Sequence, residues 1–291
     1  MAQVALRLKT ASWLSPLDRY LTPSGKMAVR AHALLLGALA SRASAVAAAA
    51  ARRPPAELQP LPSARHRLEA LRDPDTYEAY AYEPPGKPGP FPLILYLHGS
   101  GETGGLLNGT LSEGARGTPL VELWRKTAIH ELADNFAVVG PHSLTAWSPR
   151  TITKFLDFLL SPRSGLRIDR RRVYVTGHSS GGRACMAAAA TGRFAAAVPV
   201  AASPPRSAAS LGGVPIWAFH GKNDVIVDSV PMEEFVEDLR RRGAKAEDAR
   251  LTLYDSAPAP FGWPTYHGHA STIPAYATPA LYQWLLRYSV P

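Results

Sequence analysis

The sequence predicts one α/β domain, built on a mostly parallel, doubly wound sheet with helices on both faces and no large cap. From Ala64 onward, short apolar runs alternate with amphipathic stretches, which is typical of an α/β fold. The inner runs, such as 92–99 and 172–177, are almost continuously apolar rather than alternating. Strands of this kind belong to parallel sheets that helices cover on both faces.

Each predicted strand is a short run of apolar or β-branched residues between turn-forming residues. These runs are residues 76–84, 92–99, 136–141, 172–177, 196–202, 215–221 and 250–255. The segments with helical periodicity lie between or after them, at residues 119–133, 150–161, 180–191, 231–242 and 277–288. Because strands and helices alternate along the whole stretch, one domain accounts for it.

The positive charge of the chain is concentrated at its N-terminus. The net charge is +9, from 32 Lys and Arg against 23 Asp and Glu. Residues 1–53 contain eight of the basic residues and one acidic residue, which leaves 24 basic and 22 acidic residues, a net +2, for the rest. A nearly neutral folded part argues against nucleic acid as a partner. The single cysteine, Cys185, excludes an intrachain disulfide, and no group of Cys, His and acidic residues has metal-ligand spacing.

Residues 1–62 are predicted to be a targeting or disordered segment, and residues 63–291 the folded domain. The first part is rich in Ala and Arg and poor in acids, as in organellar transit peptides. With a start at Met27, the apolar run 33–40 and the small residues 43–45 instead fit a secretory signal peptide and its cleavage site. A tail without an address, in a cytoplasmic protein, is the third interpretation. The apolar run is too short to span a bilayer.

The stretch from Arg172 to Ala190, RVYVTGHSSGGRACMAAAA, contains the motif G-x-S-x-G with Ser179 at its centre. A β-rich run precedes the motif and a run of small, helix-favouring residues follows it. Such a turn exposes a serine hydroxyl, and glycines flank the serine because a Cβ there would collide with strand or helix. Ser179 is therefore predicted to be a nucleophile. A tight strand-to-helix turn without chemistry is the alternative.

A second glycine-rich loop, LYLHGSGETGG, follows an earlier predicted strand. Its backbone can supply one donor of an oxyanion hole through the N–H of Ser100, with the N–H of Ser180 as the other. We expect His98 to brace this loop by hydrogen bonding. Glu102 is a candidate for binding a polar substrate group, with a solvated loop charge as the alternative. No G-K-[ST] follows the glycines, so a phosphate-binding loop is not indicated.

An acid and a base for this serine follow in the chain. Asp224 comes directly after the predicted strand 215–221, where the acid of a catalytic triad belongs. Asp228 is its competitor, but we expect it to be a loop charge or a cap of the following helix. His267 and His269 lie before the last predicted helix, and either supplies a base. The order Ser, Asp, His is that of α/β-hydrolases.

The segments LHGSGETG, IDRRRVYVTGHSSGG, IWAFHGKNDVIV and GHASTIPAYATPALYQWLL resemble the α/β-hydrolase superfamily over about residues 76–288. More narrowly, the chain is similar to serine esterases and predicted peptidases related to polyhydroxybutyrate depolymerases and feruloyl esterases. The resemblance implies an α/β-hydrolase fold with the triad Ser179, Asp224 and His269. It favours His269 over His267 because family members tend to read G-H-x-S-W before the final helix. Ser180 and Thr272 depart from the larger residues common at these positions.

The sequence thus predicts a hydrolase that cleaves small-molecule carboxylic esters through an acyl-enzyme and needs no cofactor or metal. Trp147 is a candidate for lining the substrate pocket, with a buried core position as the alternative. A thioesterase or peptidase would use the same triad, and a non-catalytic binding module would use the same fold. A dienelactone hydrolase would be expected to carry cysteine at position 179.

Overall fold

The computed structural model describes residues 68–291, and its sheet contains eight strands. In chain order they are β1 (Glu69–Arg72), β2 (Glu78–Tyr82), β3 (Phe91–Leu97), β4 (Ala137–His142), β5 (Ile168–His178), β6 (Ala196–Val200), β7 (Ile216–Gly221) and β8 (Ala249–Tyr254). The predicted targeting segment and the predicted domain start at residue 63 lie outside the described residues, so both stay predictions.

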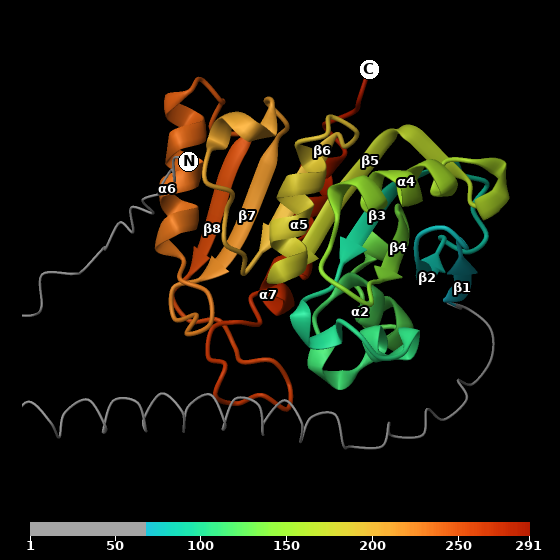
Figure 1. Ribbon diagram of the computed structural model, residues 1–291, viewed down its shortest axis with the longest axis horizontal. Helices are drawn as coiled ribbons and strands as arrows, with labels where there is room; N and C mark the ends of the chain where they lie inside the picture. Colours follow the sequence, from blue (N-terminus) through green and yellow to red (C-terminus); the bar gives the residue numbers. More distant parts are fainter. Residues whose placement is uncertain (1–67) are drawn as a thin grey trace, which may run out of the picture. The chain divides into compact units, whose positions relative to one another are not determined.

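The strands are arranged in the order β1-β2-β4-β3-β5-β6-β7-β8 (Figure 1). β2 runs antiparallel to β1 and β4, and all other pairs are parallel. In the register of β3 and β5, Leu97 lies opposite Gly177. The loop after β3 and the turn after β5 therefore leave the same edge of the sheet side by side. The predicted doubly wound, mostly parallel sheet is confirmed.

Helices pack on both faces of this sheet. They are α2 (Pro119–Arg125), α3 (His130–Ala133), α4 (Pro149–Leu159), α5 (Ser180–Ala189), α6 (Val230–Arg241), α7 (Thr272–Tyr276) and α8 (Pro279–Leu285). Alternate residues of β3 enter two separate cores. Leu93 and Leu95 pack in the core that α4, α5 and α6 share, and Ile94 and Tyr96 pack in the core of α2, α3 and α8. Both faces of β3 are thus buried, which explains its continuous apolar run.

The elements differ from the predicted ones at several places, among them α7, which was not predicted, and the start of β5 four residues before the predicted strand. The predicted helix 119–133 is two helices, because Lys126 adopts φ +63° and ends α2 in the left-handed conformation. β1 was not predicted, since its four residues are mostly exposed and form no apolar run. The glycine-rich region before α2 is not a structureless loop but contains 3₁₀ turns at Ser100–Glu102, Leu107–Leu111 and Glu113–Ala115.

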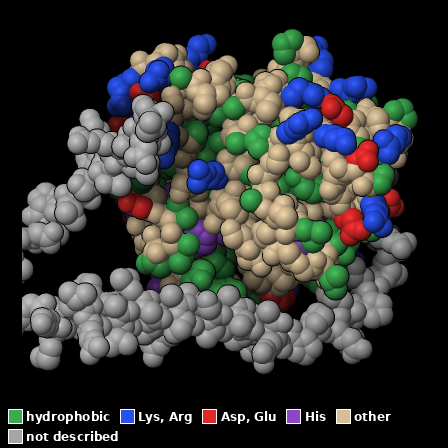
Figure 2. All heavy atoms as spheres, in the orientation of Figure 1, with side chains coloured by type: hydrophobic (Ala, Val, Ile, Leu, Met, Phe, Trp, Pro, Cys, Tyr) green, Lys and Arg blue, Asp and Glu red, His purple; other side chains and the backbone are tan. Residues whose placement is uncertain are grey.

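The surface of the described part is mixed in charge. On the face shown in Figure 2, Lys and Arg side chains alternate with Asp and Glu rather than forming one basic patch. Most ion pairs within residues 68–291 join exposed side chains, for example Arg193 with Asp157 at 2.5 Å and Lys222 with Asp255 at 2.7 Å. Among the described helices, none is long and apolar enough to cross a membrane.

Candidate active site

Ser179 occupies a sharp turn between β5 and α5. Its φ of +55° and ψ of −119° lie in a region that non-glycine residues rarely adopt. Its N–H donates to the carbonyl of Val200 at 2.9 Å, and its own carbonyl accepts from the N–H of Arg183 at 3.0 Å. Such backbone conformations cost on the order of 1–3 kcal/mol and persist only where the surroundings hold them. The turn places Ser179 at the carboxyl end of the central strand, partly exposed to solvent.

The glycines of the motif are required by close backbone contacts. A Cβ on Gly177 would lie 2.5 Å from the backbone of Gly181, and a Cβ on Gly181 would lie 2.1 Å from the carbonyl oxygen of Leu97. A Cβ on Gly182 would meet the Cβ of Ala202 at 2.7 Å. The turn therefore packs against both β3 and the end of β6. This is the steric requirement that the sequence predicted for the glycines.

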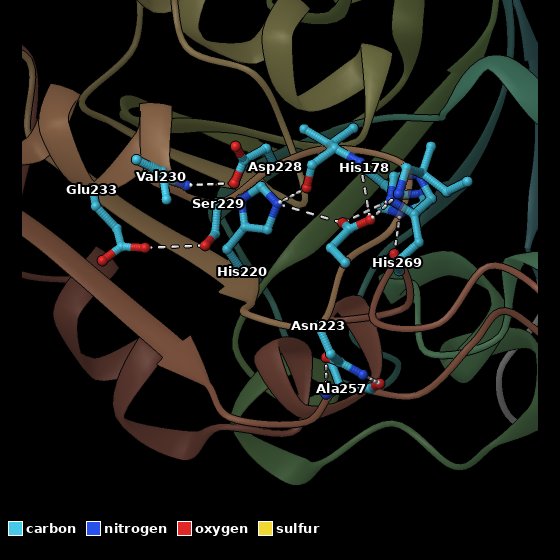
Figure 3. Close-up of polar contacts among 12 residues, drawn as sticks. His178, His220, Asn223, Asp228, Ser229, Val230, Glu233, Ala257 and His269 are labelled. Carbon is cyan, nitrogen blue, oxygen red and sulfur yellow. Dashed lines mark hydrogen bonds and ion pairs between the residues drawn. The ribbon is translucent and has the colours of Figure 1, made fainter.

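Asp224 and His269 meet across the loops that follow β7 and β8. The Nδ1 of His269 lies 2.9 Å from the Oδ2 of Asp224, and both side chains are almost completely buried (Figure 3). A carboxylate accepts hydrogen bonds, so Nδ1 of the neutral imidazole carries the hydrogen and Nε2 keeps its lone pair. An imidazole in this tautomer can accept a proton at Nε2 while the carboxylate stabilises the resulting charge.

The carboxylate of Asp224 is held by four groups. Its Oδ1 accepts from the N–H groups of Ile226 at 2.9 Å and Val227 at 3.0 Å. Its Oδ2 faces both His269 and the Nε2 of His220, which lies 3.4 Å away. Burial raises the pKa of Asp224, but hydrogen bonds from His220, His269 and the backbone outweigh burial and hold it well below its usual range. Asp224 is therefore ionised at neutral pH.

Two glycines allow the loops of Asp224 and His269 to approach. Gly268 has φ +80°, and a Cβ there would lie 2.3 Å from the backbone nitrogen of Asp224. A Cβ on Gly221 would lie 2.8 Å from the carbonyl oxygen of Gly268. The side chain of Asn223 also ties the Asp224 loop to Ala257, accepting from its N–H at 2.8 Å and donating to its carbonyl at 3.0 Å. The acid–base pair is thus fixed by backbone contact as well as by its own hydrogen bond.

His98 braces the loop after β3, as the sequence predicted. Its Nε2 accepts from the N–H of Ser143 at 2.9 Å, so its Nδ1 carries the hydrogen and donates to the carbonyl of Gly99 at 2.8 Å. Burial lowers the pKa of His98 to about 4, which keeps this ring neutral. The indole N–H of Trp147 donates to the carbonyl of His98 at 3.0 Å. Trp147 is partly buried against His98, and its predicted place in a substrate pocket stays a prediction.

Ser100 and Ser180 each begin a helical segment, the first a 3₁₀ turn and the second α5. The first N–H groups of a helix have no partner within that helix. The register of β3 with β5 brings these two segments to neighbouring positions at the same edge of the sheet. Their N–H groups are thus available to an acceptor. Their role in an oxyanion hole stays a prediction.

Glu102 has a partly buried carboxylate that lies over Gly99. Its Oε2 is 3.4 Å from the position that a Cβ on Gly99 would take, and the Nδ1 of His178 is 3.3 Å from that same position. Burial raises the pKa of Glu102 to about 7, although backbone N–H groups lower it. None of the ion pairs of the described residues includes Glu102. Substrate binding and a solvated loop charge both stay predictions for Glu102.

The remaining candidates lie away from this cluster. Asp228 is exposed and accepts from the N–H of Val230, in the first turn of α6. His267 is exposed, and its carbonyl accepts from the N–H of Val225 at 3.0 Å. Sequence reasoning missed His178 and His220, which both contact the acid–base pair. The signals available were their places beside Ser179 and four residues before Asp224.

Comparisons with known proteins place the fold of this chain among solved structures. Residues 142–265 match the dienelactone hydrolase family, a stretch that includes Ser179 and Asp224 and ends before His269. A thermostable esterase has 23% identity and a TM-score of 0.62, over 77% of this chain and 63% of its own. The chain thus spans less than two thirds of that esterase. The chain has the α/β-hydrolase fold.

Two further α/β-hydrolase neighbours come from Staphylococcus aureus. A fluorophosphonate-binding serine hydrolase has 14% identity and a TM-score of 0.52, over 76% of this chain and 98% of its own. An S-formylglutathione hydrolase has 14% identity and a TM-score of 0.51 with the same coverage. A comparison with curated protein sequences gives no match.

The family match and these neighbours support an enzyme of the hydrolase class. The match to dienelactone hydrolases is to the family over part of this chain, and the serine at position 179 still differs from the cysteine expected for that activity. Within residues 68–291, no three or more His, Cys, Asp and Glu side chains are grouped so as to hold a metal ion.

Proposed function

We propose that this α/β-hydrolase cleaves carboxylic esters of small molecules through an acyl-enzyme on Ser179. The observation that carries the proposal is the buried hydrogen bond of 2.9 Å between His269 and Asp224. The serine of the proposed triad, Ser179, lies in a strained turn between strand and helix. A buried imidazole–carboxylate pair together with a partly exposed serine is the set of groups that activates a hydroxyl nucleophile.

In this mechanism, Nε2 of His269 takes the hydroxyl proton as the Oγ of Ser179 attacks the ester carbonyl carbon. The negative charge that develops on the carbonyl oxygen is stabilised by the N–H groups of Ser100 and Ser180. The C–O bond to the alcohol then breaks, and the alcohol leaves with the proton from His269. Water, deprotonated by His269, attacks the acyl carbon and releases the acid, which restores Ser179. Asp224 holds the imidazole and stays ionised throughout.

Substrate binding is assigned to residues in and beside the loop after β3. Glu102 belongs to this loop, and its carboxylate would contact a polar group of the substrate. Trp147 would line the pocket with its ring edge while its N–H holds the loop. Thioester or amide cleavage requires the same triad and differs only in the leaving group. The same residues would therefore carry out these reactions.

Labelling with a fluorophosphonate probe tests the proposal on the full chain. We expect one equivalent of probe on the peptide that contains Ser179, with no labelling of Ser179→Ala. Asp224→Asn should label at least about 10³-fold more slowly, because the imidazole loses the partner that fixes its tautomer. The matched control is Asp228→Asn, which changes an exposed carboxylate on the same loop and should label at the wild-type rate.

Unlabelled wild-type protein is then assayed with ester, thioester and amide substrates of the same acyl group, and pre-treatment with the probe should abolish the activity. Preference for the ester supports an esterase, and preference for one of the others reassigns the leaving group on the same triad. If folded wild-type protein neither reacts with the probe nor hydrolyses any of the three, the protein is a non-catalytic binding module and the proposal is wrong.

A further inference from the structure

His178 contacts the three segments that the proposed mechanism has to bring together. It precedes Ser179 at the end of β5, and its ring lies against the His269 loop on one side and the Gly99 loop on the other. Its imidazole ring and that of His269 are 4.7 Å apart between centroids, at an angle of 50°. Figure 3 shows both rings on the same side of the cluster.

The hydrogen bond of His178 acts on the backbone of the base rather than on its ring. Its Nε2 lies 2.7 Å from the carbonyl oxygen of His269. A carbonyl only accepts, so Nε2 carries the hydrogen and donates. In the described part of the chain, no other group donates a hydrogen bond to that carbonyl. The bond sets where the His269 backbone lies relative to the residue that precedes the nucleophile.

The other ring nitrogen of His178 faces the loop after β3. A Cβ on Gly99 would lie 3.3 Å from Nδ1 and 3.5 Å from the carbonyl oxygen of His178. The ring therefore fills the space between Gly99 and His269, and a side chain at position 99 would crowd it. The backbone of Gly99 leads directly into Ser100, whose N–H the mechanism uses.

The ring does this without adding charge. Burial and the adjacent His269 lower the pKa of His178 to about 4, so it is neutral at physiological pH. A permanently charged side chain in this place would oppose protonation of His269 and would require a counterion in a buried position. Neutral His178 supplies one hydrogen-bond donor and a flat ring of fixed size.

We infer that His178 is a positioning residue for the proposed esterase: its N–H to the His269 carbonyl and its ring against Gly99 set the spacing between the serine, the base and the oxyanion loop. This inference rests on the proposed function. Because a misplacement of about 1 Å can cost on the order of 10²-fold in rate, loss of the donor should lower kcat and leave KM nearly unchanged.

The test compares His178→Asn with His178→Gln in the full chain. The longer amide of Gln can place an N–H near the position of Nε2, whereas the shorter amide of Asn does not reach the His269 carbonyl. We expect His178→Asn to lower kcat and the fluorophosphonate labelling rate about 10- to 100-fold, and His178→Gln to recover most of this loss. The exposed His130→Asn is the control and should match wild type.

A merely structural role gives a different pattern. Both variants would then lose thermal stability and activity together, and Gln would not rescue the rate. That result overturns the inference, as does a wild-type kcat for His178→Asn. Wild-type protein in the same assay keeps the two proposals apart: it hydrolyses ester whether or not His178 positions the base, and its inactivity overturns the proposed function and this inference together.

Discussion

The Nε2 of His220 lies 3.4 Å from the Oδ2 of Asp224, the same oxygen that His269 contacts at 2.9 Å. The Nε2 is also 2.9 Å from the carbonyl of Val227, so its hydrogen points toward two acceptors. The ring is completely buried, and its Nδ1 has no hydrogen-bond partner among the described residues. A buried polar atom without a partner costs free energy of folding. The same ring stabilises the ionised carboxylate of Asp224, the acid of the proposed triad, by its contact at Nε2.

Replacing His220 should therefore reduce the stabilisation of the Asp224 carboxylate. In His220→Leu, Asp224 loses one donor and the carbonyl of Val227 loses its partner, so we expect kcat to fall about 10-fold and the protein to lose about 1–3 kcal/mol of stability. His220→Gln keeps an N–H near Nε2 and should retain most of the rate. Initial rates and urea unfolding of the three proteins measure both effects. Equal kcat values for His220→Leu and wild type would contradict the expectation.

The turn at Ser179 should not tolerate a methyl group on Gly181. In Gly181→Ala, the new Cβ would lie 2.1 Å and 2.4 Å from the carbonyl oxygens of Leu97, the last residue of β3, and of His98, which follows it. Both are backbone atoms and cannot rotate away as a side chain could. We expect a loss of more than about 3 kcal/mol or no folded protein. The matched control is Gly109→Ala, where a Cβ meets nothing within 4 Å, and urea unfolding should place it within about 0.5 kcal/mol of wild type.

The predicted strands are all present because the buried sheet imposes a local pattern. β3, β6, β7 and the part of β5 from Val173 onward are covered on both faces, so their sequences are almost entirely apolar and can be recognised as strands without knowledge of their neighbours. The break at Lys126 and the short edge strand β1 carry no such pattern. Lys126 adopts a conformation that its residue type does not favour, and the exposed residues of β1 could belong equally well to a loop.

The sequence could predict the candidate residues that belong to motifs in a known order along the chain. It could not predict the contacts between residues that are distant in the sequence. Ser179, Asp224 and a histidine follow in a recognisable order, so the sequence predicts the triad, and the family resemblance favours His269 over His267. His178 reaches the carbonyl of His269 across 91 residues, and Gly268 is needed only because the Asp224 backbone lies against it. Contacts of this kind are set by how the loops fold back over the sheet, which residue type and spacing do not reveal.

The carboxyl of Glu102 should make stability depend on pH in a defined direction. Burial raises its pKa from 4.5 to about 7, so the folded state keeps the proton where the unfolded state has lost it. The contribution of this carboxyl to the free energy of unfolding is fully present below pH 4.5 and is lost as the pH rises through about 7. Glu102→Gln has no such titration. Its stability relative to wild type should therefore increase between pH 4.5 and 8, on the order of 1–3 kcal/mol.

Thermal unfolding at pH 5 and pH 8 measures this difference. The exposed Glu234→Gln serves as the control, and its difference from wild type should be the same at both pH values. A Glu102→Gln difference that does not change with pH would mean that the carboxylate is solvated in the folded protein, against the position over Gly99 found here.

Trp147→Phe separates the two roles that Trp147 can have. Phe keeps a ring against His98 and Tyr77, whose centroids lie 4.7 Å and 5.4 Å from that of Trp147, but it removes the N–H that holds the His98 carbonyl. If the N–H acts by bracing the loop that leads to Ser100, kcat should fall a few-fold and stability by about 1 kcal/mol, with KM unchanged. If the indole instead contacts the acyl group, KM should rise for bulky esters and stay constant for acetyl esters. Steady-state kinetics on the two ester types measures each role, and because the proposed function gives Trp147 both, we expect kcat to fall for all esters and KM to rise for bulky ones only.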